Sequence, residues 1–514
     1  MNGAESLVRT LLASGVDTCF TNPGTSEMHI VAALDRAPAM RCVLGLFEGV
    51  VTGAADGYAR MSGKPACTLL HLGPGLANGL ANLHNAHRAR VPIVNLVGQH
   101  PLDHLPHDAP LTSDIEAIAR PYSRWLRTSL SASALGRDAA EAVLASRTAP
   151  CRIATLIIPA DAAWSEGGSI PEIPAVHNPP LPSTATVNRA ATMLRSGART
   201  GLILAGSALQ GRGLTAAGRI AAVTGAKLFS PYPFARMERG AGLPRVERTQ
   251  YVVEQALEQF KEFRQLILVG APPPVAYFAY SDKSSILTAR ECELFALATP
   301  AEDCAGALES LVATLSIGKT TPLAEESERA ALPTGEITLP NLAAAVGALL
   351  PEDTIVVDES MTSGRGMMAA TRGAPPHHWL ANTGGSIGIG LPLAVGAAIA
   401  SPERRVLCLT ADGSAMYTAQ ALWTMARESL RVTTIVFANR AYAVLQREFA
   451  GIGVGQPGPR AQALFDIGHP DLDWVALARG MGVPAIRANS MDDFAKALQH
   501  GFESEGPSLI EVRV

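Results

Sequence analysis

The stretch from Val406 to Val444 restricts the fold of this chain more than any other part of the sequence. It opens with an apolar run, Val406 to Thr410, that is short enough for a buried parallel strand. A turn and a helical pattern follow, and a second apolar run, Thr433 to Ala438, ends on Asn439. The apolar residues of the helical pattern recur at spacings of three and four: Met416, Ala419, Leu422 and Trp423. The order strand, turn, helix, strand predicts a βαβ unit of a parallel sheet.

Polar residues stand at the carboxyl ends of both predicted strands, where open α/β sheets bind their ligands. Asp412 offers a carboxylate and Asn439 an amide oxygen, and both are hard ligands suited to Mg²⁺ or Ca²⁺. Gly413 allows a close approach to a phosphate, and Ser414 can donate to it at the helix N-terminus. A bare Asp-Gly-Ser is usually an ordinary turn, but the strand before it and the Asn after the next strand favour a diphosphate held through a divalent metal.

Composition and charge exclude several classes of protein. With 514 residues, 47% hydrophobic and 17% charged, the chain suits an α/β enzyme of about three domains. Its net charge of −4 without a basic stripe argues against a nucleic-acid partner. We find neither a secretory signal nor an apolar run of about 18 residues, so we expect no membrane span. Seven scattered cysteines without CxxC pairing favour a reducing cytoplasm.

Strands alternate with helices along the whole chain, which predicts an α/β fold of three doubly wound parallel-sheet domains. We expect the first domain at residues 1–167, the central α/β domain at 185–315 and the third domain at 335–514. The proline-rich stretch Ile170 to Pro182 reads as an extended linker, and Ile317 to Pro340 as a weaker break.

Asp412-Gly413-Ser414, followed 27 residues after the Asp by Asn439, resembles the thiamine diphosphate (ThDP) signature, although Ala411 stands where that signature has Gly. Two similar outer domains around a plainer central one resemble the ThDP-dependent 2-oxo acid decarboxylase and acetolactate synthase superfamily over nearly the whole chain. The nearest resemblance is to benzoylformate decarboxylase. It implies ThDP and Mg²⁺, with Ca²⁺ as the alternative metal, and it implies the Ala441 carbonyl as a third metal ligand and Tyr442 as a cofactor contact.

The resemblance assigns Glu48 to the first domain's cofactor site. A glutamate at a helix start is usually a satisfied N-terminal charge, but Glu48 lies in LGLFEGVVTGAADGYAR, which resembles the family segment whose Glu bonds the pyrimidine ring. A carboxylate there promotes removal of the thiazolium proton, and the cofactor then serves as nucleophile and electron sink. In the family this Glu and the diphosphate motif meet across a subunit interface, which implies at least a homodimer and a homotetramer as the full assembly.

The stretch Asn382 to Pro392, NTGGSIGIGLP, resembles the family loop that bends the cofactor. The Gly385 carbonyl would accept from the pyrimidine amino group, and Ile387 would wedge between the two rings. On its own the stretch would be a glycine-rich strand-to-helix turn with one core Ile.

Two residues are expected to face the substrate. Thr25, in NPGTSEM, matches a serine of benzoylformate decarboxylase that binds the substrate carboxylate, and His71, in LLHLGPG, matches a His of that enzyme. A lone His after an apolar strand is often structural, but its position beside Gly73-Pro74-Gly75 favours an acid–base group, since imidazole titrates near neutral pH.

The chain departs from benzoylformate decarboxylase at Phe278, which stands where that enzyme has a second catalytic His. His104 and His107 are candidates for the missing proton donor, with ordinary loop histidines as the alternative reading of each. Three further residues are expected in the pocket wall: Leu111, Val444 and Glu448.

Three hypotheses remain open from the sequence. The first is a ThDP- and Mg²⁺-dependent decarboxylase of a small-molecule 2-oxo acid, with carboligation as a second outcome. The second is an acetolactate synthase-like carboligase, against which stand His71 and the lack of an obvious FAD pattern, so that FAD is not expected. The third is a non-catalytic ThDP-binding homologue, favoured only by Phe278 and Ala411.

Overall fold

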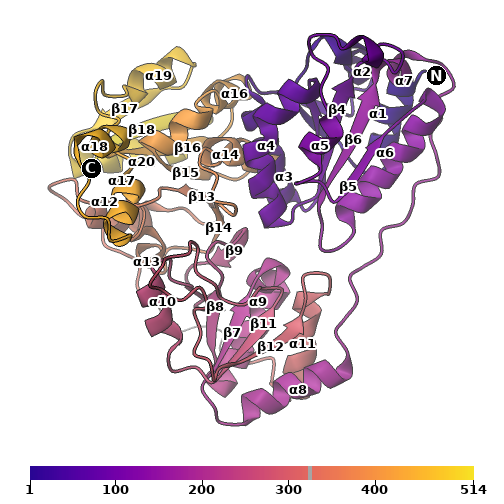
Figure 1. Ribbon diagram of the computed structural model, residues 1–514. Coiled ribbons are helices and arrows are strands. Elements are labelled where there is room, and N and C mark those ends of the chain that lie inside the picture. Colours follow the sequence, from indigo (N-terminus) through magenta and orange to yellow (C-terminus); the bar gives the residue numbers. More distant parts are fainter. Residues whose placement is uncertain (322–326) are drawn as a thin grey trace.

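The computed structural model describes residues 1–321 and 327–514. The chain forms three lobes, each built on its own sheet, and Figure 1 shows the first and third lobes side by side above the central one. The predicted break from 317 to 340 includes residues 322–326, which lie outside the described residues. Residues 170–182, predicted to be an extended linker, carry no helix or strand and run along the outside of the molecule (Figure 1).

The first lobe contains a six-stranded, all-parallel sheet with the order β2-β1-β3-β4-β6-β5. Its strands are β1 (Thr18–Asn22), β2 (Arg41–Leu44), β3 (Ala66–Leu70), β4 (Ile93–Gln99), β5 (Trp125–Thr128) and β6 (Ile153–Pro159). Its helices are α1 (Gly3–Ala13), η1 (Thr25–Glu27), α2 (Met28–Asp35), α3 (Glu48–Ser62), α4 (Leu72–Ala89), η2 (Leu105–His107), α5 (Ile115–Ala119), α6 (Ala132–Arg147) and α7 (Ala160–Trp164). Because every residue of β3 and β4 is buried, both faces of this sheet are covered by helices.

The central lobe contains a five-stranded parallel sheet with the order β10-β8-β7-β11-β12. Its strands are β7 (Thr200–Leu204), β8 (Lys227–Ser230), β10 (Glu247–Arg248), β11 (Gln265–Val269) and β12 (Glu293–Ala298). Its helices are α8 (Thr184–Arg195), η3 (Gly206–Leu209), α9 (Gly211–Thr224), α10 (Val253–Phe260) and α11 (Cys304–Thr314).

The third lobe contains a seven-stranded sheet with the order β17-β18-β16-β15-β13-β14-β9. Its strands are β9 (Arg236–Arg239), β13 (Ile355–Glu359), β14 (His377–Ala381), β15 (Val406–Ala411), β16 (Val432–Ala438), β17 (Ala485–Ala488) and β18 (Ser508–Arg513). Its helices are α12 (Leu339–Leu349), α13 (Met367–Ala370), α14 (Gly390–Ala400), α15 (Asp412–Ala415), η4 (Met416–Thr418), α16 (Ala421–Arg427), α17 (Ala443–Gly451), α18 (Pro459–Phe465), α19 (Trp474–Gly480) and α20 (Met491–Glu503).

Two details differ from the sequence-based expectation. The edge strand β9 comes from within residues 185–315 yet pairs antiparallel with β14, so the third sheet is not wholly parallel. The helix predicted through Met416 and Trp423 is broken into α15, η4 and α16, and Met416 is exposed while Leu422 is buried. The predicted order strand, turn, helix, strand is otherwise present in β15 to β16.

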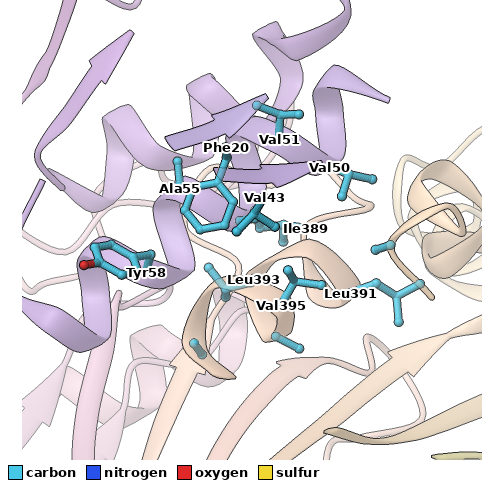
Figure 2. Close-up of a cluster of buried hydrophobic side chains, with 14 of the residues drawn as sticks. Phe20, Val43, Val50, Val51, Ala55, Tyr58, Ile389, Leu391, Leu393 and Val395 are labelled. Atoms are coloured by element: carbon cyan, nitrogen blue, oxygen red, sulfur yellow. The ribbon is translucent and has the colours of Figure 1, made fainter. Parts of the chain in front are cut away.

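The first and third lobes meet where α3 crosses α14. Their backbones approach so closely that a Cβ added to Gly57 would lie 2.1 Å from the Leu393 carbonyl oxygen, and one added to Gly396 would lie 1.8 Å from that of Ala54. Figure 2 shows the apolar side chains at this contact, with Val50 and Ala55 from α3 facing the segment of Leu391 and Leu393. One continuous hydrophobic core therefore spans both lobes, and the starts of α3 and α14 lie at the same end of the contact.

No helix within the described ranges is long and apolar enough to cross a membrane. The seven cysteines, all within the described residues, form no disulfide with one another.

The strand pair of β9 and β14 contains two histidines that accept from arginines, the buried His377 and the partly buried His378. The Nη1 of Arg239 lies 3.1 Å from the Nε2 of His377, whose Nδ1 lies 2.8 Å from the Pro375 carbonyl oxygen. The Nε of Arg236 donates to the Nδ1 of His378 at 3.2 Å. Burial, reinforced by the nearby guanidinium groups, lowers the pKa of each histidine to about 3. Both imidazoles are therefore neutral at pH 7.

The folded-state pKa of each histidine lies below its unfolded value. The contribution of each neutral histidine to the free energy of unfolding is therefore present above about pH 6.5 and is lost as the pH falls. Between pH 7 and 5 the unfolding free energy should drop by up to about 2 kcal/mol for each histidine. Urea unfolding at several pH values measures the slope. The double variant His377→Gln/His378→Gln should flatten it, whereas the exposed control His177→Gln should not. Equal slopes in the double variant and the wild type would contradict this account.

Candidate active site

Thr25, His71 and a buried glutamate, Glu27, come together beyond the ends of β1 and β3. The Nδ1 of His71 lies 2.8 Å from the Oε2 of Glu27, which also accepts from the Gly24 backbone N–H at 2.9 Å. The ring of His71 packs directly on Gly24, where an added Cβ would lie 2.1 Å from Nδ1. Thr25, the next residue, is exposed. Burial raises the pKa of the Glu27 carboxyl, and the charge of His71 opposes that rise. Glu27 therefore fixes the orientation of the imidazole.

Glu48 opens α3 and lies beside His71. Its Oε2 accepts from the Nδ2 of Asn78 on α4 at 3.0 Å. A Cβ added to Gly75 would lie 3.3 Å from both the Oε1 of Glu48 and the Cβ of His71, so only a glycine separates the two side chains. Glu48 is 8% exposed. We call Thr25, Glu27, Glu48 and His71 the N-terminal half-site.

The predicted metal ligands lie at the ends of β15 and β16, which are neighbours in the sheet. The Oδ2 of Asp412 accepts from the Arg440 backbone N–H at 2.7 Å, and its Oδ1 accepts from Gly413 N–H at 2.9 Å. The Oδ1 of Asn439 accepts from Ala441 N–H at 3.0 Å. Burial raises the pKa of Asp412, while the N–H groups of Arg440 and Gly413 oppose the rise. These bonds join the carboxylate, the amide and the Ala441 backbone into one turn.

The ring of Tyr442 lies over Gly413. A Cβ at position 413 would lie 2.6 Å from the Cε1 of Tyr442, so the glycine is required for this contact. Ser414 is buried next to it in α15. The turn is thus small and rich in backbone N–H groups, as a phosphate site requires.

The stretch from Asn382 to Ile389 forms a loop between β14 and α14, held by α4 of the first lobe. Asn85 donates from Nδ2 to the Ser386 carbonyl oxygen at 2.8 Å, and its Oδ1 accepts from Ser386 N–H at 3.3 Å. Gly385 is exposed at φ 78°, a left-handed conformation that favours glycine, and Ile387 is half-buried. We call the loop and the metal turn together the C-terminal half-site: Gly385, Ile387, Asp412, Gly413, Ser414, Asn439, Ala441 and Tyr442.

A buried glutamate that the sequence did not single out supports this loop from below. Glu359, the last residue of β13, is 2% exposed. Its carboxylate accepts from the backbone N–H groups of Gly388, Ile389 and Gly390 at 2.9, 3.1 and 2.8 Å.

Aromatic residues of the central lobe border the same loop. The hydroxyl of Tyr277 approaches Gly385 so closely that an added Cβ there would lie 2.0 Å from it. Phe278, half exposed, packs edge-on against Tyr277 with ring centroids 5.0 Å apart. Glu448, expected in the pocket wall, accepts from the hydroxyls of Tyr251 at 2.9 Å and Tyr280 at 2.6 Å. Its carboxylate therefore joins α17 to the central lobe.

The other predicted pocket residues lie in less defined positions. His107 is exposed at the end of η2, where the rings of His100, His104 and His107 pack in series at 5.3 and 5.7 Å between centroids. Leu111 is half-buried against the core shared by the two outer lobes. Val444 is half-buried in the first turn of α17, close to Tyr442.

Comparison with known proteins identifies the family of this chain. The family description "Thiamine pyrophosphate enzyme, N-terminal TPP binding domain" matches residues 1–118, and "Thiamine pyrophosphate enzyme, C-terminal TPP binding domain" matches residues 363–512. A Mycobacterium tuberculosis protein named "Putative acetolactate synthase large subunit IlvX" is 51% identical, over 100% of this chain and 99% of that protein. Benzoylformate decarboxylase of Pseudomonas aeruginosa is 29% identical, over 97% of this chain and 96% of that enzyme.

The chain therefore belongs to the thiamine pyrophosphate-dependent enzyme family. Members of that family similar to this chain include both decarboxylases and acetolactate synthases, among them acetolactate synthase isozyme 1 large subunit of Escherichia coli, 26% identical over 100% of this chain and 94% of that protein.

Solved structures share the fold. The ThDP-dependent 4-hydroxybenzoylformate decarboxylase of Rhodococcus jostii RHA1 superposes with a TM-score of 0.88 at 24% identity, covering 100% of this chain and 99% of that one. Benzoylformate decarboxylase of Polynucleobacter necessarius gives 0.82 at 21% identity, with 100% and 99% coverage. The three-lobed α/β architecture predicted from the sequence is thereby confirmed.

The residues of the C-terminal half-site fit a metal-bound diphosphate. A carboxylate, an amide oxygen and a backbone carbonyl are the donor set that Mg²⁺ prefers. Within the described residues no group of three or more His, Cys, Asp or Glu side chains could hold a metal. The glycine at 413 leaves room for the Tyr442 ring against the backbone of this turn.

Replacing Gly413 with Ala tests whether this turn holds the diphosphate. The added Cβ would push Tyr442 away, so ThDP affinity in the presence of Mg²⁺ should fall by about tenfold or more, which corresponds to roughly 1.4 kcal/mol. Isothermal titration calorimetry measures the affinity. The matched control is Gly506→Ala, whose Cβ meets nothing within 4 Å. A folded Gly413→Ala protein with wild-type ThDP affinity would contradict the assignment.

Proposed function

We propose that this protein is a ThDP- and Mg²⁺-dependent decarboxylase of a 2-oxo acid, with carboligation as a second outcome. One observation carries the proposal: His71 is held by the buried Glu27 and lies beside Glu48, with its ring packed on Gly24, the residue before Thr25. An oriented imidazole beside a carboxylate and a hydroxyl is the set that acid–base chemistry on a 2-oxo acid requires.

Each residue then has a stated task. Bound ThDP would supply the nucleophilic carbon and the electron sink. Glu48 would hold a proton at its carboxylate against the pyrimidine ring. Because the Nδ1 of His71 is engaged by Glu27, its Nε2 is the atom left to give or accept a proton near the substrate.

The remaining tasks concern binding and orientation. The Thr25 hydroxyl would donate to the substrate carboxylate, while Asp412, Asn439 and the Ala441 carbonyl would hold Mg²⁺ and, through it, the diphosphate. The Gly385 carbonyl and the Ile387 side chain would set the conformation of the bound cofactor. Tyr277 and Phe278 would close the pocket on the side of the central lobe.

An acetolactate synthase-like carboligase is the second candidate. The name of the M. tuberculosis relative at 51% identity supports it. Phe278 supports it as well, since its apolar ring, packed against Tyr277, supplies no proton to release a free aldehyde. The two candidates share every residue of both half-sites and differ in the fate of the intermediate.

We further propose a homotetramer built from catalytic dimers. Within the described residues no hydrogen bond or ion pair joins a side chain of the N-terminal half-site to one of the C-terminal half-site. Met416, Tyr417 and Leu445 near the metal turn are also 44%, 54% and 47% exposed, which suits cover by a second subunit. Light scattering on the purified protein measures the assembly. The unpaired thiols are consistent with a cytoplasmic enzyme.

The deciding experiment measures CO₂ release from benzoylformate, pyruvate and a panel of other 2-oxo acids by protein loaded with ThDP and Mg²⁺. Release with a free aldehyde as product supports the decarboxylase. Release from pyruvate with acetolactate as product supports the synthase. A protein that binds ThDP but releases no CO₂ from any acid would overturn both.

Glu48→Gln should separate catalysis from binding. Loss of the carboxylate should lower the rate of CO₂ release by about 100-fold or more, while ThDP affinity, measured by calorimetry, changes little. The control Asp492→Asn removes an exposed carboxylate from the first turn of α20 and should leave both values unchanged. Full activity in Glu48→Gln would show that the assignment of Glu48 is wrong.

A further inference from the structure

We propose that Glu359 is a positioning residue: its buried carboxylate fixes the loop from Asn382 to Ile389, and thereby the direction in which the Gly385 carbonyl and Ile387 face the cofactor. The inference rests on the proposed function of that loop. Glu359 would act through the loop and would not touch substrate or cofactor itself.

Four donors converge on this one side chain. Oε1 accepts from Gly388 N–H at 2.9 Å, from Ile389 N–H at 3.1 Å and from the Nδ2 of Asn382 at 3.3 Å. Oε2 accepts from Gly390 N–H at 2.8 Å. Burial raises the pKa of the Glu359 carboxyl to about 7, and the hydrogen bonds from the N–H groups of Gly390, Ile389 and Gly388 oppose that rise.

The loop is gripped at both of its ends by the same carboxylate. Asn382 lies at its beginning and Gly388 at its end, so the Glu359 carboxylate holds the two ends of the loop together. Asn382 passes the constraint on, because its Oδ1 accepts from Gly385 N–H at 2.8 Å and its Nδ2 also donates to the Ser386 carbonyl oxygen at 2.9 Å. A chain of hydrogen bonds therefore runs from Glu359 through Asn382 to the backbone of Gly385.

The direction of the Gly385 carbonyl follows from this clamp. The carbonyl belongs to the peptide unit between Gly385 and Ser386, whose N–H is bound by the Oδ1 of Asn85 at 3.3 Å. In a trans peptide the C=O points opposite to the N–H. Asn85 on α4 binds the Ser386 N–H, and Asn382 binds the Gly385 N–H. The Gly385 carbonyl is therefore turned away from α4 toward the exposed face of the loop.

Glu359 also links the loop to the metal turn. It pairs in register with Thr410 on β15, two residues before Asp412. The loop that would face the pyrimidine and the turn that would bind the diphosphate are therefore both anchored on the neighbouring strands β13 and β15. Gly390 is shaped for this contact, since an added Cβ would lie 3.0 Å from the Oε2 of Glu359.

A role as a helix cap alone does not account for all the contacts of Glu359. Capping α14 requires only the N–H groups near its first turn, whereas Glu359 also holds the Asn382 amide at the far end of the loop. A cap should affect stability alone. A positioning residue should affect the pyrimidine end of the cofactor and leave the diphosphate end unchanged.

The test compares two probes, ThDP and inorganic pyrophosphate, each titrated with Mg²⁺ into the full-length protein by calorimetry. In Glu359→Gln an amide N–H₂ faces N–H donors, so ThDP affinity should fall at least tenfold while pyrophosphate affinity stays within about twofold of wild type. Asn382→Ala removes the link to Gly385 without touching the start of α14 and should give the same selective loss. It serves as the second variant if Glu359→Gln does not fold.

The matched control is Asp358→Asn. Asp358 precedes Glu359 in β13 but accepts from Ser360 N–H at 3.0 Å and from the Trp379 indole N–H at 3.2 Å, away from the loop. Its substitution should change the melting temperature and leave both affinities unchanged. Wild-type ThDP affinity in Glu359→Gln and Asn382→Ala, or an equal loss of both probes, would overturn the inference. If the wild-type protein itself bound pyrophosphate but not ThDP, the proposed function would fail first.

Discussion

The close packing of α3 on α14 is the contact on which the rest of the site depends. Glycines at 57 and 396 bring the two helix backbones within reach of each other's carbonyl oxygens, and the apolar cores of the two outer lobes merge around them. Because each helix begins at a functional segment, the crossing fixes the distance from Glu48 to the loop before Gly390. Interiors packed this tightly transmit displacement rather than absorb it, so the starts of α3 and α14 are held rigidly relative to each other within one chain.

The two half-sites share one design. Each uses the carboxyl ends of adjacent parallel strands, and each places a buried carboxylate behind the groups that face the ligand. Glu27 stands behind His71 as Glu359 stands behind the loop of Gly385 and Ile387. Burying such carboxylates without partners costs free energy. Glu359 accepts from four donors, whereas Glu27, within the described residues, is hydrogen-bonded only at Oε2, by the Gly24 N–H and by His71. The exposed functional groups are thereby held by groups that water does not reach.

Much of the fold and part of the site could be predicted from the sequence. The apolar runs at 406–410 and 433–438 became β15 and β16, because short β-branched runs bounded by turns have few alternatives. Asp412 and Asn439 were singled out because their strand-end positions are local features, whereas Glu48 was assigned through the resemblance of its segment to a family motif.

The remaining features depend on contacts that no local pattern encodes. Glu359 stands beside Asp358 in the sequence, and only the tertiary fold decides which of the two carboxylates meets the loop. Glu448 accepts from Tyr251 and Tyr280, which lie 197 and 168 residues away in the sequence. Strand β9 belongs to a sheet whose other strands begin more than a hundred residues later. Break points such as η4 within a helical pattern likewise arise from packing against Gly388 and its neighbours rather than from propensity.

The antiparallel strand β9 has a consequence for how this polypeptide can be divided. A segment cut from the chain just before α12 would leave β14 as a bare sheet edge, with its N–H and C=O groups unpaired and the buried Trp379 beside them. The third lobe therefore cannot be transferred intact by gene fusion or shuffling without β9. Recombination between related genes would have to transfer the central and third lobes together.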